Sequence, residues 1–104
     1  MTGKYILDGH KPVPASLMKW ARWFEKADRH VAITKKDDVQ VSTVFLGINY
    51  NWVEGPPLLF ETAIFGGSQD GYKEWCSTWD EAEAMHAKAC ELAFASSAGV
   101  VLCP

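Results

Sequence analysis

The chain has few cysteines, and they follow no useful spacing. Its three cysteines, Cys76, Cys90 and Cys103, are an odd number, and none forms a Cys-x-x-Cys pair. Disulfide frameworks and zinc sites both require several cysteines or histidines at short, regular spacings. We therefore expect neither of them, and we expect no bound cofactor.

Long apolar runs are also missing. A membrane-spanning helix needs about 20 consecutive apolar residues, and no stretch of the chain approaches that length. The first apolar run, Tyr5-Ile6-Leu7, is too short for the core of a signal peptide. We therefore expect a protein of the reducing cytoplasm, with no membrane contact.

An excess of positive charge is the third absence. The chain has 10 Lys and Arg against 13 Asp and Glu, which gives a formal net charge of -3. Proteins that bind nucleic acid by neutralising phosphates present a basic face. The basic residues here are scattered along the sequence, so we expect no direct contact with nucleic acid.

Catalytic motifs are absent as well. There is no Gly-x-Ser-x-Gly elbow, and Gly66-Gly67-Ser68 lacks the Gly-Lys-Ser/Thr of a phosphate-binding loop. His86 and Cys90 have a spacing of four residues, which suits one helix face, but two ligands do not make a metal site. We expect no metal, and we interpret His86 as a hydrogen-bonded core histidine.

Glu61 is the most interesting acid, because it lies between Phe60 and Thr62 in an apolar segment. If it faced the interior, burial would raise its pKa, which is how a catalytic acid is made. If the segment has one solvent-facing side, Glu61 is an ordinary surface residue. We favour the solvent-facing interpretation.

What the chain does contain is typical of one small globular domain. Its 104 residues are 48% hydrophobic and 22% charged, and the five tryptophans can supply much of a core. We therefore expect a single domain over residues 1–104. Periodicity and turn residues predict its elements in this order: strand 4–8, helix 17–29 with Ser16 as N-cap, strands 31–35 and 39–46, loop 49–57, strands 58–65 and 72–77, and a final helix.

The final helix has the clearest start signal. Thr78-Trp79-Asp80-Glu81 is a capping box, and an inner stripe follows at Ala82, His86, Ala89 and Ala93. Residues 96–104 are predicted as an edge strand or a loose tail. Unbroken runs of strands favour antiparallel pairing. The predicted fold class is therefore α+β, with an antiparallel sheet of four to five strands and two helices packed on one face.

One segment is suited to binding. Asn49-Tyr50-Asn51-Trp52 places two large rings among amides in a loop, and Tyr and Trp dominate binding hot spots. Alternatively, Trp52 folds back over the edge of the core. The start of the last helix adds acidic surface. The predicted binding residues are Asn49, Tyr50, Asn51, Trp52, Trp79, Asp80 and Glu83.

Four segments together resemble a family of small uncharacterised proteins encoded by bacteriophages and prophages. They are residues 20–27 (WARWFEKA), 41–47 (VSTVFLG), 55–62 (GPPLLFET) and 77–79 (STW). The resemblance covers most of residues 15–90. It implies a phage accessory factor acting in a host bacterium, and it brings no known activity. Members of the family often have Asp-His where this chain has Asn49-Tyr50, which argues against an acid–base role for that pair.

Three functional hypotheses follow. The leading one is a non-catalytic phage protein that binds and modulates or inhibits a host protein, such as an antiviral defence component. The second is a homo-oligomeric sponge that sequesters a nucleotide-like signalling molecule, with Trp and Tyr stacking on a base and Arg22, Arg29 or Lys73 meeting phosphate. The third is a small enzyme that uses Glu61.

Overall fold

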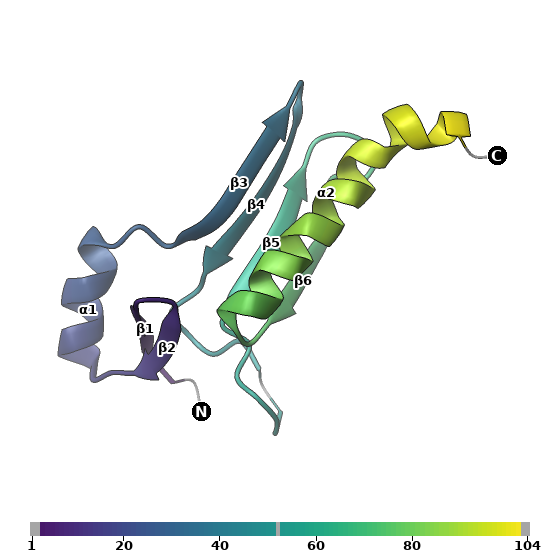
Figure 1. The fold of residues 1–104 in the computed structure, drawn as a ribbon. Coiled ribbons are helices and arrows are strands. Elements are labelled where there is room, and N and C mark those ends of the chain that lie inside the picture. The colour runs from purple at the N-terminus through teal and green to yellow at the C-terminus, as the bar shows by residue number, and fades with distance from the viewer. Residues whose placement is uncertain (1–2, 52, 103–104) are drawn as a thin grey trace.

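The structure is a computed structural model that describes residues 3–51 and 53–102, with the backbone alone described for residues 95–102. The described residues form six strands and two helices, and Figure 1 shows their arrangement. In chain order they are β1 (Tyr5–Asp8), β2 (Lys11–Pro14), α1 (Leu17–Lys26), β3 (His30–Lys36), β4 (Val39–Phe45), β5 (Phe60–Phe65), β6 (Lys73–Cys76) and α2 (Trp79–Leu102).

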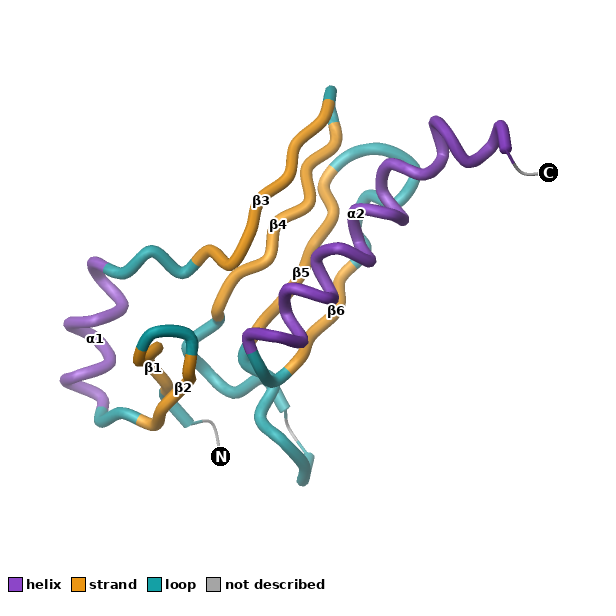
Figure 2. The backbone as a smooth tube through the Cα atoms, in the orientation of Figure 1, coloured by secondary structure: helices purple, strands orange, loops and turns teal. Residues whose placement is uncertain are grey.

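The main sheet has four antiparallel strands in the order β3-β4-β5-β6. Along β4 and β5, buried and less buried residues alternate, because successive side chains of a strand point to opposite faces. One face is covered by α2, which contacts all four strands (Figures 1 and 2). The predicted α+β class and the predicted antiparallel sheet are confirmed.

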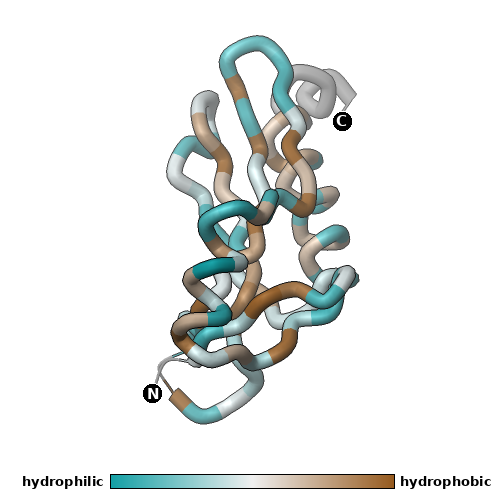
Figure 3. Tube along the Cα trace, turned by 90° about the vertical axis from the view of Figure 1, so that its left-hand side faces the viewer, coloured by the Kyte–Doolittle hydropathy of each residue, from teal (hydrophilic) through white to brown (hydrophobic). Residues whose placement is uncertain are grey.

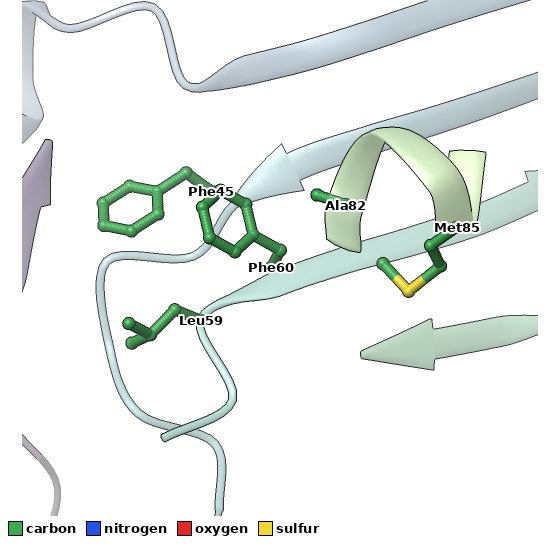
Figure 4. Packing of buried hydrophobic residues seen from close by; sticks show 5 residues of the cluster. All are labelled: Phe45, Leu59, Phe60, Ala82 and Met85. Atoms are coloured by element: carbon green, nitrogen blue, oxygen red, sulfur yellow. The ribbon is translucent and has the colours of Figure 1, made fainter. Parts of the chain in front are cut away.

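The core lies between this face and α2. One cluster joins Phe45, Leu59 and Phe60 to Ala82 and Met85 of the helix, and Figure 4 shows their side chains together. The second cluster joins β4 and β5 to a later part of α2. Its buried members are Val41, Ile64, Ala89 and Ala93. Figure 3 shows apolar residues distributed along the strands and polar residues concentrated at the turns. The small alanines allow the helix backbone to lie close to the sheet.

The capping box at the start of α2 is confirmed. The Glu81 amide donates to the Thr78 hydroxyl over 3.1 Å, and the Glu81 carboxylate accepts from the amides of Ser77 and Thr78. These bonds satisfy amides that an uncapped helix would leave without partners.

The N-terminal region departs from the prediction. Residues 11–14, for which no strand was predicted, pair with β1 in a two-stranded hairpin. Only α2 lies on the predicted face, whereas α1 packs mainly beside β1 and reaches the sheet by Trp23, whose ring meets Phe45 edge to face. The hairpin occupies apolar surface of α1, so α1 cannot lie flat on the sheet.

The inner face of α1 is formed by aromatic residues. Trp20, Trp23 and Phe24 face the protein, whereas Leu17 is exposed. Positions 20, 23 and 24 have the i, i+3, i+4 spacing of one helix face, and the three rings carry more apolar area than Leu17.

Two helix ends were predicted wrongly. α1 ends at Lys26 instead of residue 29, because Ala27 is extended (ψ 144°) and the Asp28 carboxylate accepts a hydrogen bond from the His30 amide. The predicted edge strand or loose tail at 96–104 is helical through Leu102, because no proline interrupts the segment before Pro104. Residues 103 and 104 lie outside the described part. Within the described ranges, no helix is long and apolar enough to cross a lipid bilayer.

Candidate functional site

Most of the predicted binding residues lie at one end of the four-stranded sheet. There the β4–β5 loop, the start of α2 and the turn between β1 and β2 come together (Figure 1). We call this surface the loop end and define it by Tyr50, Val53, His10, Trp79 and Asp80. Trp52, which was predicted to bind, lies outside the described residues.

The asparagines of the loop hold its backbone. The Asn49 side-chain oxygen accepts hydrogen bonds from the amides of Asn51 and Leu58, at 2.8 and 3.0 Å. The Asn51 side chain accepts from the Val53 amide and donates to the carbonyl of Pro56. Both amide groups, predicted as binding groups, are therefore engaged inside the loop and give it a defined shape.

Among the described residues of this loop, Tyr50 and Val53 are exposed large apolar side chains. Tyr50 is 46% exposed and Val53 is 75% exposed. Tyr50 was predicted, whereas Val53 was missed. The sequence could have indicated the exposure of Val53, because an apolar residue in a loop rich in Asn, Gly and Pro has no core to face.

A groove of about 410 Å³ lies between the β1–β2 turn and the start of α2. The imidazole of His10 is stacked on the indole of Trp79, with centroids 3.7 Å apart and planes within 3°. The indole N–H of Trp79 is buried and has no hydrogen-bond partner among the described residues. The groove is lined by Asp8, His10, Lys11, Pro12, Thr78, Trp79 and Asp80.

The charges of the groove have both signs. Asp8 and Asp80 are acidic and Lys11 is basic, and all three are exposed. Glu83, also predicted to bind, is exposed on the next turn of α2 but does not line the groove. In the described ranges, no three His, Cys, Asp or Glu residues are placed to hold a metal ion. The groove suits hydrogen bonding and ring stacking.

Glu61 and His86 lie on opposite sides of the sheet. Glu61 pairs across the strands with Val44 and Trp75, on the face that α2 leaves uncovered, as predicted. His86 points from α2 into the covered face and is buried. The sheet therefore separates the acid and the histidine.

The ring of His86 is held by threonines of two strands. Its Nε2 lies 2.9 Å from the Thr34 hydroxyl, and its Nδ1 lies 2.7 Å from that of Thr43, which also contacts the hydroxyl of Thr62. Burial lowers the pKa of His86, so the ring is neutral near pH 7. Both nitrogens are occupied, and the predicted core histidine is confirmed.

The thiols are not arranged as nucleophiles. Burial, together with the negative charge of Glu81, raises the pKa of Cys76 to about 11. A thiol with such a pKa is protonated at neutral pH and attacks poorly. Cys76 and Cys90 are free thiols, and Cys103 lies outside the described residues.

The cations proposed to meet a phosphate do not gather around the aromatic residues of the loop end. Arg29 donates to the Phe45 carbonyl over 2.9 Å and lies over the ring of Phe24. Lys73 lies in β6 with its side chain on the uncovered face, and Arg22 is exposed on α1. Among the described Lys and Arg residues, Lys11 alone lines the groove.

Comparison with protein-family models, with curated proteins and with solved structures finds no match to this chain.

Proposed function

We propose that the chain is a non-catalytic accessory protein of phage type, which binds and modulates a host protein, such as an antiviral defence component, through its loop end. The observation that carries the proposal is the pair of exposed apolar side chains, Tyr50 and Val53, on a loop held in shape by its own asparagines.

The loop geometry favours binding because it is formed before a partner arrives. Four hydrogen bonds from the side chains of Asn49 and Asn51 fix the backbone on both sides of the loop. A loop that is already ordered loses less conformational entropy on association. A tyrosine presented in this way can bury a large area with little loss of rotamer freedom.

A partner with a convex apolar group and a basic rim fits this surface. The groove between the β1–β2 turn and the start of α2 offers the stacked rings of His10 and Trp79. Asp80 and Glu83 add negative charge at the edge. A protein surface supplies an apolar projection and basic side chains together more readily than a small anionic ligand does.

The test is affinity capture from host lysate with the wild type and with Tyr50→Ala, Val53→Asp and the double variant in parallel. Met18→Ala, at an exposed apolar residue of α1, is the matched control. The captured protein is then purified, and its affinity for each variant is measured. We expect Tyr50→Ala to weaken binding by about tenfold or more and Met18→Ala to leave it unchanged. A specific partner that binds the double variant normally would contradict the assignment of the loop end.

The sponge hypothesis is tested by thermal denaturation with a panel of nucleotides. A ligand at 100 times its dissociation constant adds about 2.7 kcal/mol to the free energy of unfolding. Stabilisation by a nucleotide that is lost in His10→Ala would favour sequestration in the groove over protein binding. The Glu61 enzyme hypothesis has less support, since Glu61 and His86 lie on opposite faces of the sheet.

A further inference from the structure

The sheet has one face that neither helix of the described residues covers. α2 lies on the other face (Figure 1), and α1 packs mainly beside β1. The uncovered face, which we call the open face, carries large apolar side chains from three strands: Ile33 is 50%, Phe65 51% and Trp75 39% exposed. Val44 and Ala63 lie between them on the central strands. A sheet face of this composition is normally buried against another layer.

The charges of the open face are self-complementary. Glu61 pairs across the strands with Trp75, and Lys73 lies two residues from Trp75 in the same strand. Neither Glu61 nor Lys73 forms an ion pair with any residue in the described ranges. Trp75 thus adjoins both an unpaired carboxylate and an unpaired ammonium group.

We propose that the open face is a docking surface for a second copy of this chain. In the proposed dimer, a two-fold axis lies between the two open faces, passes beside Trp75 and runs diagonally to the strands. Rotation about this axis brings Glu61 of one copy over Lys73 of the other. Each Glu61 then faces the Lys73 of the other copy, twice in the dimer, and the two Trp75 rings meet at the axis. The strands of the two sheets cross at nearly a right angle, which is one of the two usual modes of sheet packing.

The remaining charge of the face is compatible with this arrangement. Lys35 lies at the corner opposite Trp75 and is exposed at the rim near the β3–β4 turn. Water screens the repulsion between two rim lysines. The loop end is a different surface, so this inference does not depend on the proposed function.

The test is sedimentation equilibrium of the full chain from about 1 μM to about 1 mM, a range that covers weak and moderate dimers. We expect a monomer–dimer equilibrium for the wild type, and a dissociation constant raised by about tenfold or more in Trp75→Ala. Met18→Ala is the matched control for an exposed apolar residue, and it should dimerise normally. A wild type that stays monomeric throughout the range would overturn the proposal.

Charge exchange tests the orientation. Glu61→Lys alone and Lys73→Glu alone should each weaken the dimer, because like charges then meet. The double variant with both substitutions should recover most of the wild-type affinity. A dimer that resists all these changes uses another surface, and failure of the double variant to recover rejects the diagonal axis. Circular dichroism of each variant checks that loss of the dimer is not loss of the fold.

Discussion

The two helices of this protein are attached in different ways. α2 contacts all four strands and buries Ala82, Ala89 and Ala93 against them. α1 has no buried residue and contacts mainly β1. Yet α1 has the clearer separation of apolar and polar residues in the sequence. The comparison teaches that an amphipathic pattern predicts a helix but does not measure how deeply it will be buried.

The N-terminal region is held by a few specific contacts near Gly47. The Trp20 indole donates to the Gly47 carbonyl over 2.9 Å, and the Tyr5 amide donates to the same oxygen. Phe24 lies against the glycine, where an added Cβ would be 3.0 Å from its ring. We call α2 with strands β3 to β6 the α2–sheet unit, and β1, β2 and α1 the N-terminal region. We expect the α2–sheet unit to set the global stability and the N-terminal region to open separately.

The largest effect is expected in the α2–sheet unit. Phe60→Ala removes a fully buried ring and should lower the free energy of unfolding by about 3–5 kcal/mol. Phe65→Ala, in the same strand but on the open face, is the matched control and should cost much less. Urea denaturation at low protein concentration measures both. Equal losses would mean that the open face is buried in the monomer.

A glycine substitution tests whether the two regions are separable. Gly47 has φ +77°, so Gly47→Ala combines a strained backbone with contact against Phe24 and should cost about 1–3 kcal/mol. Hydrogen exchange should become faster in α1 and stay slow in α2. Uniform acceleration in both helices would show that the chain opens as one unit.

The polar network under α2 gives the next test. Thr43→Val keeps the side-chain shape but removes the hydroxyl that contacts Nδ1 of His86 and the Thr62 hydroxyl. Leaving these groups without partners should cost about 1–3 kcal/mol. Thr34→Val, at the exposed end of the network, should cost less. If both substitutions have the same effect in thermal denaturation, the buried half of the network has no special importance.

The N-cap hydrogen bonds of the two helices allow the same contact to be compared in both regions. Thr78→Ala should lower global stability by about 0.5–2 kcal/mol, because α2 is part of the core. The Ser16 hydroxyl accepts from the Lys19 amide over a longer distance, 3.3 Å. Ser16→Ala should therefore reduce α1 helicity, with little change in the global unfolding midpoint. Calorimetry and circular dichroism separate the two outcomes.

The smallest expected effect is that of pH on the α2–sheet unit. Burial lowers the pKa of His86 in the folded chain, so the unfolded chain binds this proton more readily. Stability from this residue is complete above pH 6.5 and is lost as the pH falls below 6.5 toward the folded pKa. His86→Gln should flatten the stability profile between pH 7.5 and 5.5, which urea denaturation at a series of pH values measures. An unchanged profile in His86→Gln would contradict this interpretation.

Local signals accounted for most of the fold. Alternation in 39–45 predicted β4, and Thr78 with Glu81 predicted the start of α2, because neighbours in sequence make these contacts. Residues 49–51 were correctly predicted to lie in a loop, and Tyr50 is exposed there. That Asn49 and Asn51 hold the loop could not be predicted, since their partners depend on how it closes.

The sequence by itself determined the four strands of the main sheet, their antiparallel pairing and the starts of both helices, because periodicity and turn chemistry are local. Only the tertiary structure decided that the hairpin of β1 and β2 keeps α1 off the sheet, that His10 stacks on Trp79, and that Glu61 and His86 face opposite sides. Those outcomes depend on contacts between residues distant in sequence. Which of several apolar surfaces meet is settled by the packing of the whole chain.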